Sequence, residues 1–155
     1  MLLTVEQSGA AMELCKPVVA QSLSSKAASV VLALGYNRLS SMRSDSESER
    51  QVKILIFWMA WWLDTSFSVR LGRAPIIRPH DIAVPQLSEN SIIPKGWVVA
   101  FNYSTRISGL QCKIVEQLYT PGAVLETAEE RSKRASQLLN ELYEAWEARG
   151  PVSCP

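Results

Sequence analysis

The sequence predicts an all-α fold, an irregular helical bundle, and three observations support this prediction. Ten consecutive apolar residues run from Ile54 to Leu63, a length that suits a helix enclosed by other protein and is too short for a bilayer span. Flanking segments repeat apolar residues at intervals of three and four, which is the spacing of one helical face. The polar and apolar alternation typical of strands never extends beyond a few positions.

Length and charge bound the class of protein. A chain of 155 residues, 47% of them hydrophobic, is expected to form one domain with a buried core. We expect this domain to span residues 1–150 and residues 151–155 to form a tail. Sixteen Lys and Arg residues nearly balance fifteen Asp and Glu residues, which leaves a formal charge of +1. Because duplex binding favours a clustered basic face, this segment alone is not expected to bind DNA.

The first predicted helix covers about residues 18–34. Its apolar residues recur at helical spacing, and Pro17 and Gly35 are suited to its first turn and to its end. One face of this helix is therefore expected to be dry. That face consists of Val19, Leu23, Ala27, Val30, Val31 and Leu34.

The second predicted helix, about residues 48–71, contains the apolar run. It follows a serine-rich segment in which Ser46 and Glu49 have the spacing of a capping box, and Gly72 is suited to a left-handed helix end. Three of the five tryptophans lie in this helix: Trp58, Trp61 and Trp62. We interpret them as core residues, because each ring buries roughly 150–250 Å² when it is enclosed. The alternative is that they line a pocket for a small hydrophobic effector.

An extended, proline-rich crossover is predicted at residues 73–95, because proline lacks the amide donor and clashes with the preceding helical turn. Its branched apolar residues indicate packing along the core, since a disordered linker is poor in such residues. Two further helices are predicted at about residues 96–119 and 126–148. The last of these opens with a second capping box, from Thr127 to Glu130.

Candidate chemistry is sparse. His80 and Asp81 are adjacent, but no motif places a nucleophile or a metal beside them, so we predict no catalytic, cofactor-binding or metal-binding residue. Asp64 ends the apolar run, where an unpaired charge is costly. We therefore expect an ion pair between Asp64 and Arg70 or Arg73, which would fix how the helix meets the crossover. The alternative role for this carboxylate is ligand binding.

Cysteine usage and the N-terminal sequence indicate the compartment. The three cysteines are too widely spaced for a disulfide framework or a zinc ligand set, and we interpret them as free thiols. The N-terminus lacks the features of a secretory signal, and no apolar run reaches the length of a membrane span. The chain is therefore expected to be intracellular, with no membrane partner.

An ordered set of residues forms a signature along the chain. These residues are Leu34, Gly35, Arg38, Trp58, Asp64, Arg70, Leu71, Gly72, Arg73, Pro75, Asp81 and Pro85. The most specific element is Leu-Gly-Arg-x-Pro, which follows Leu-Asp after a short interval. The signature resembles the fungal-specific transcription factor domain, which is the middle homology region of fungal zinc binuclear cluster regulators. The resemblance is close over residues 20–87 and looser over residues 100–146.

This resemblance implies an all-helical, non-enzymatic region that regulates a transcription activator in the nucleus, sometimes in response to metabolites. In the family, zinc and DNA are bound by an N-terminal cysteine cluster, and only Cys15 precedes the signature here. The chain itself is therefore expected to hold no cofactor and to reach DNA only through another domain. Thr65 departs from the family pattern, which commonly has a basic residue at this position.

The family domain is also longer than this chain. We therefore expect the central part of a regulator, either a gene-model fragment or a shortened protein. Apolar faces left uncovered are expected to favour a homo-oligomer or contacts with other transcription regulators. The alternative function is a helical protein-interaction scaffold without DNA targeting.

Overall fold

Six α-helices make up most of the part of the chain that the computed structural model describes, which is residues 2–13, 16–88 and 91–149. No strand occurs in these residues, and the predicted all-α class is confirmed. The proposed tail at 151–155 lies outside the described residues. The helices are α1 (Leu2–Glu13), α2 (Pro17–Ala33), α3 (Glu47–Arg70), α4 (Lys95–Ile114), α5 (Pro121–Val124) and α6 (Ala128–Glu147).

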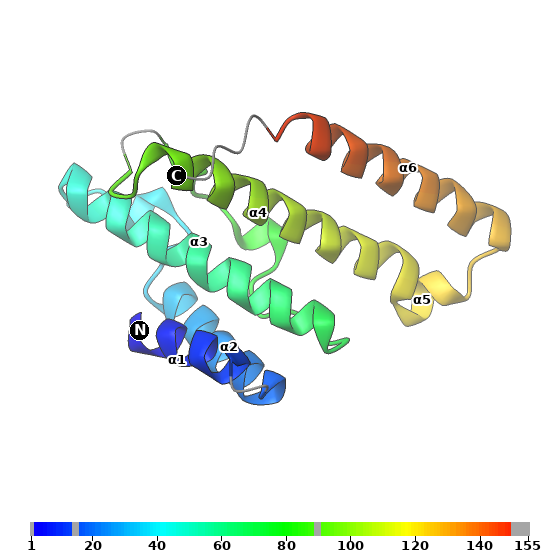
Figure 1. Ribbon diagram of the computed structural model, residues 1–155, viewed down its shortest axis with the longest axis horizontal. Coiled ribbons are helices and arrows are strands. Elements are labelled where there is room, and N and C mark those ends of the chain that lie inside the picture. Colours follow the sequence, from blue (N-terminus) through cyan, green and yellow to red (C-terminus); the bar gives the residue numbers. More distant parts are fainter. Residues whose placement is uncertain (1, 14–15, 89–90, 150–155) are drawn as a thin grey trace.

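The helices are stacked in successive layers. Figure 1 shows α1 and α2 side by side, α3 across the middle of the molecule, α4 on the far side of α3, and α6 along the outer side of α4. Helices α3 and α4 run in the same direction (Figure 1), so the chain between them must return along the length of α3. This geometry explains why a long crossover is needed at this point.

The predicted helices correspond to α2, α3, α4 and α6, and the structure also contains α1 and the short α5, which were not predicted. The segment predicted as one helix at 96–119 is α-helical only as far as Ile114, and Val115–Tyr119 continues as a π-helical turn. Helix α1 was not predicted, because its weak apolar periodicity gave no signal of an amphipathic helix. It is held in place by tertiary contacts, including a hydrogen bond of 2.9 Å from Ser8 Oγ to the carbonyl of Ala20.

Both predicted capping boxes are present at helix starts. Ser46 Oγ accepts from the amide of Glu49 at 3.3 Å, and Glu49 Oε2 accepts from the amide of Ser46 at 2.9 Å. Thr127 and Glu130 make the same reciprocal pair at the start of α6, at 3.2 and 3.0 Å. Each box satisfies amides that the first helical turn would otherwise leave without partners.

Glycines end α2 and α3 as the sequence predicts. Gly35 has φ +72° and Gly72 has φ +63°, a left-handed conformation that glycine adopts without a steric penalty. After α2, the amide of Tyr36 donates to the carbonyl of Val31 at 2.9 Å, which closes a Schellman motif. After α3, the amide of Arg73 donates to the carbonyl of Ser68 at 2.8 Å in the same way. These stops set the direction in which the chain leaves each helix.

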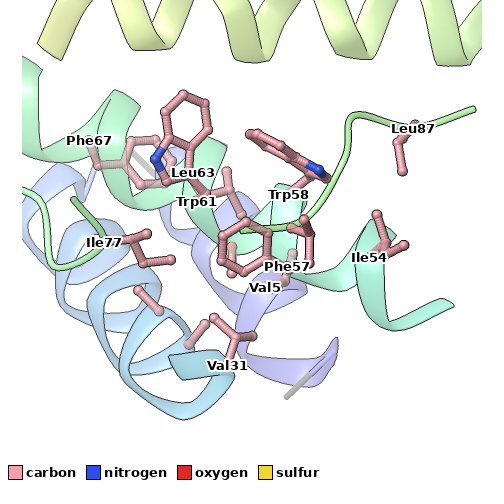
Figure 2. Close-up of a cluster of buried hydrophobic side chains, with 14 of the residues drawn as sticks. Val5, Val31, Ile54, Phe57, Trp58, Trp61, Leu63, Phe67, Ile77 and Leu87 are labelled. Atoms are coloured by element: carbon pink, nitrogen blue, oxygen red, sulfur yellow. The ribbon is translucent and has the colours of Figure 1, made fainter. Parts of the chain in front are cut away.

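The core lies where α3 meets α1, α2 and the crossover (Figure 2). Phe57 is fully buried, and Trp58 and Trp61 are 5% and 3% exposed, so the interpretation of these two rings as core is confirmed. The two indoles pack edge to face with centroids 5.4 Å apart, a favoured geometry for aromatic pairs. In length and composition α3 also qualifies as a membrane span, but half of its most apolar window is buried within the protein.

The predicted dry face of α2 is partly wrong. Ala27 and Val31 are buried as expected, but Val19, Val30 and Leu34 are 48%, 43% and 52% exposed. The buried face consists instead mainly of small residues, which allow the backbones of α1 and α3 to approach α2 closely. These are Ala20, Gln21, Ser24, Ala27, Ala28 and Val31. Larger apolar side chains are left on the outer surface as a result.

The crossover packs along the core, as predicted. Ile77 is fully buried, and Val84 and Leu87 are 8% and 4% exposed. A single 3₁₀ turn at Pro79–Asp81 interrupts the extended path. The segment is therefore an ordered part of the domain and contributes side chains to its interior.

Candidate functional site

A buried carboxylate fastens the crossover to the helices. Asp64 lies on α3 with no exposed surface, and its Oδ1 accepts from Ser25 Oγ of α2 at 2.9 Å. Its Oδ2 accepts from the backbone amides of Ile76 and Ile77, at 2.6 and 3.2 Å. One side chain thus joins α2, α3 and the crossover. Burial raises the pKa of Asp64, and the three hydrogen bonds act in the opposite direction without cancelling the rise.

The expected ion pair between Asp64 and Arg70 or Arg73 is wrong. The Schellman turn at the end of α3 reverses the chain, so that crossover amides reach the carboxylate where an arginine was expected. Arg73 instead donates from Nη1 to Gln21 Oε1 of α2 at 2.8 Å. Backbone amides satisfy a buried carboxylate without a guanidinium that would itself have to be desolvated.

Further hydrogen bonds hold the crossover beyond Asp64. Trp58 donates from Nε1 to the carbonyl of Pro85 at 2.7 Å, so the indole that fills the core also fixes the chain above it. Asn37 donates from Nδ2 to the carbonyl of Asp81 at 2.8 Å, and its backbone carbonyl accepts from the amide of Ala83 at 2.9 Å. The loop after α2 and the crossover are therefore joined side by side.

The signature residues thus fall into three groups. Trp58, Asp64, Asp81 and Pro85 meet at the crossover through the bonds above, and Arg73 ties the end of α3 to α2. A second group, with Gly35, Leu71, Gly72 and Pro75, forms the two helix stops and the chain that leaves α3. Of the remaining three, only Arg38 takes part in the crossover contacts. Leu34 is exposed, Arg38 forms a backbone bridge with Ala83, and Arg70 lies at a groove described below.

Sequence reasoning missed the partners of these residues. Ser25 and Gln21 lie on α2 and were not singled out, because nothing in the spacing of a serine or a glutamine indicates a contact far along the chain. Asn37 lies next to Arg38 of the signature, and its polar side chain shortly after a helix stop is the signal that could have identified it.

The pair considered for catalysis lies at the surface. His80 is exposed, and its Nε2 is 3.9 Å from Asp81 Oδ1 in the 3₁₀ turn. The other carboxylate oxygen of Asp81 accepts from the amide of Arg78 at 3.0 Å. Both residues therefore serve the local turn, and no nucleophile is brought to them in the contacts of the described residues.

An apolar groove of ≈ 680 Å³ runs between α3 and α4, with α1 and α6 at its edges. Trp62 of the tryptophan cluster lines this groove, and the alternative that these rings line an effector pocket stays a prediction. The walls carry several hydroxyl groups and a single charged side chain, that of Arg70. The main lining residues are Trp62, Ser66, Phe67, Arg70, Tyr103, Ser104, Ile107, Ser108, Gln111, Leu142 and Trp146.

A second cavity of ≈ 620 Å³ lies on the other side of α4, between α3, α6 and the crossover. The edges of Trp58 and Trp61 reach it, but its rim carries charges of both signs. Lys113 of α4 and Glu141 of α6 form an ion pair across this rim at 2.7 Å. The first groove is therefore the more apolar of the two and is the stronger candidate for binding an organic ligand.

No group of three His, Cys, Asp or Glu side chains is placed to hold a metal within the described ranges. Cys112 is buried, and burial raises the pKa of its thiol, which disfavours a metal-binding thiolate. The other two cysteines lie outside the described residues. The described residues of this chain therefore do not fit the zinc cluster that the resemblance associates with the family.

An all-helical domain whose crossover is fastened by a buried carboxylate, with an apolar groove beside it, is the class of protein that the fold and the site define. The chain belongs to the fungal specific transcription factor domain family, whose model matches residues 6–140. This match begins earlier than the resemblance visible in the sequence and includes most of α1. No curated protein and no solved structure matches the chain.

Proposed function

We propose that this chain is the regulatory region of a fungal transcription regulator that acts in the nucleus. Membership of the family supports a regulatory region of this kind. The observation that carries the proposal further is the groove of ≈ 680 Å³, which has a densely packed helix, α3, on one side and the sparsely buried α6 at its edge. If α6 can occupy two positions against α3 and α4, a ligand that binds one of them more tightly shifts the population toward that position.

DNA and zinc binding belong, in this proposal, to another segment of the full regulator. The balance of charges supports this division, because cations are interleaved with acids instead of forming a basic face. Arg134, for example, pairs with Glu126 at 2.7 Å. The chain is proposed to act by changing contacts and not by catalysis, and its partners are proposed to be a second copy or other transcription regulators.

A reporter assay tests this function. The chain is fused to a neutral DNA-binding module in fungal cells, and reporter output is measured on several carbon and nitrogen sources. We expect output to differ from that of the module alone and to depend on the nutrient. Fluorescent tagging of the native protein is expected to show it in the nucleus.

Two variants of α6 provide a matched control for the role of the groove. Trp146 lines the groove, whereas Tyr143 on the same helix is exposed outside it. Trp146→Ser is expected to alter the nutrient response, and Tyr143→Ser is expected to leave it unchanged. Output equal to that of the bare module under every condition would contradict the proposal.

The second candidate function is a helical interaction scaffold without DNA targeting. The observation that favours it is the outer face of α2, where Val19, Val30 and Leu34 are exposed together. Genomic sequence upstream of Met1 separates the two functions. A cysteine-rich, lysine-rich exon in frame supports the regulator, and its absence supports the scaffold.

A further inference from the structure

The groove beside α3 has one charged side chain in an otherwise uncharged lining. Arg70 is exposed at the end of α3, and in the part of the chain that the structure describes no carboxylate or carbonyl accepts from its guanidinium. Two other arginines near the ends of α3 are paired: Arg73 binds Gln21, and Arg50 binds Glu47 at 3.0 Å. An unpaired guanidinium over an apolar groove is complementary to an anion attached to an apolar body.

The charge lies at one end of the groove. Because α3 and α4 run in the same direction (Figure 1), Trp62 and Tyr103 lie toward the start of the groove, and Arg70 and Gln111 toward its end. Eight residues separate Trp62 from Arg70, which corresponds to about 12 Å along a helix. The groove therefore has one charged end and a long section that is mainly apolar, with the hydroxyls of Ser66, Ser104 and Ser108 along it.

The apolar section is bounded by two helices that differ in how firmly they are held. Phe67 of α3 is 7% exposed and belongs to the core, whereas Leu142 and Trp146 of α6 are 39% and 52% exposed. Burial of a ligand against these two side chains would remove apolar surface from water on both ligand and protein. The guanidinium of Arg149 stacks on the Trp146 ring, 3.4 Å from its centroid.

We propose that this groove binds a linear, medium-chain apolar carboxylate, with the carboxylate on Arg70 and the chain along Trp62 and Trp146. The volume of ≈ 680 Å³ is in the range that holds small organic ligands. An uncharged chain of the same length lacks the ionic hydrogen bond and binds more weakly. The regulatory meaning of this binding rests on the proposed function, but the binding itself does not.

Titration of the purified chain with decanoate and with decan-1-ol tests the proposal by calorimetry. Wild-type protein is expected to bind decanoate about tenfold more tightly than the alcohol, as one charge-assisted hydrogen bond predicts. Arg70→Gln is expected to lose this tenfold preference and to keep its affinity for decan-1-ol. Arg106→Gln, an exposed arginine of α4 that lines the other cavity, is the matched control and is expected to bind like wild type.

A second variant tests the position of the chain. Ser66 is half-buried in the groove wall, and Ser66→Phe is expected to abolish binding of both ligands while the thermal melt remains cooperative. If this variant does not fold, Trp146→Ser at the exposed edge replaces it, with an expected loss of about tenfold for both ligands.

Three results would overturn the proposal. These are no binding of decanoate to the wild type, an equal effect of Arg70→Gln on acid and alcohol, or a wild-type dimer that Trp146→Ser dissociates. The last result would mean that a second copy occupies the groove. The reporter assay keeps the two proposals separate, because a nutrient response without decanoate binding refutes only this inference. Binding without any reporter response refutes only the regulatory function.

Discussion

Helices α3 and α6 are similar in length, but their surroundings differ. Ten residues of α3 are buried, including Phe57, Trp58 and Asp64, whereas only Leu138 and Ala145 are buried among the described residues of α6. Helix α3 is enclosed by α1, α2, α4 and the crossover, while α6 packs mainly on α4 (Figure 1). The same chain therefore contains a firmly held frame, which consists of α3 with α1, α2, α4 and the crossover, and an outer helix, α6, which is attached to this frame along one side.

This difference bears on how a ligand could change the molecule. A helix held by few buried side chains opens at a lower free energy than one held by many. The groove lies between α3 and α6, so a ligand that fills it adds contacts that hold α6 in place against α3. Variants that act on only one of these two helices test whether α6 opens at a lower free energy than α3.

The largest expected effect is the loss of a core ring from α3. Phe57 is fully buried, and Phe57→Ala is expected to lower the free energy of unfolding by about 3–5 kcal/mol, because it leaves a cavity in a packed core. Trp146→Ala on α6 removes a larger but half-exposed ring and is expected to cost about 1 kcal/mol or less. Urea denaturation followed by circular dichroism measures both. Equal losses would show that α6 belongs to the frame.

The second largest effect concerns the carboxylate that fastens the crossover. Asp64→Ala removes the acceptor for two backbone amides, of which that of Ile77 is buried, and for Ser25, and is expected to cost about 3 kcal/mol. Asp64→Asn is the control, because its carbonyl can accept from both amides while its NH₂ donates to Ser25 Oγ. We expect the asparagine variant to lie within about 1 kcal/mol of wild type. An asparagine variant as unstable as the alanine variant would show that the charge itself is required.

The pKa of Asp64 gives a pH dependence with a definite sign. Burial raises this pKa above its ordinary value of 3.8, so the folded state holds the proton more tightly than the unfolded state. The resulting stabilisation is complete below the unfolded pKa and is lost as the pH rises through the folded pKa. Wild type is therefore expected to lose stability relative to Asp64→Asn as the pH increases.

Urea titrations of both proteins between about pH 4 and pH 7 measure this difference. The comparison with Asp64→Asn is needed because Glu49 and Glu130 have pKa values lowered by their capping serine and threonine, which act with the opposite sign. These two carboxylates are the same in both proteins and cancel in the difference. A difference that does not change with pH would mean that the pKa of Asp64 is the same in both states.

The frame was largely predictable from the sequence, and the reason is local. Capping boxes at Ser46 and Thr127 and the stops at Gly35 and Gly72 depend on neighbouring residues, so short patterns identify them. The ten-residue apolar run predicts burial wherever it packs. These features all indicate the same helices, and a fold can be predicted from its sequence when local features agree in this way.

Contacts between distant segments were not predictable in the same way. Asp64 was expected to need a partner, but the choice of backbone amides over Arg73 depends on how the chain turns after α3. The buried face of α2 was misplaced because alanine and serine give a weaker periodic signal than Val30 or Leu34, although close helix packing favours the small residues. The groove depends on where α6 docks on α4, which no local pattern specifies.

The smallest expected effect is the loss of a helix cap, and it compares the local stability of α3 with that of α6 directly. Ser46→Ala and Thr127→Ala remove equivalent caps from α3 and α6, each worth about 1 kcal/mol. Amides of α3 are expected to exchange only through global unfolding, so Ser46→Ala is expected to raise exchange in α3 and in the core packed against it, and to leave exchange in α6 unchanged. Because α6 has few buried side chains, Thr127→Ala is expected to speed exchange in α6 by about fivefold and to leave α3 unchanged. Uniform acceleration in both variants would mean that α6 unfolds only with the rest of the molecule, and the groove would then have no independently mobile edge.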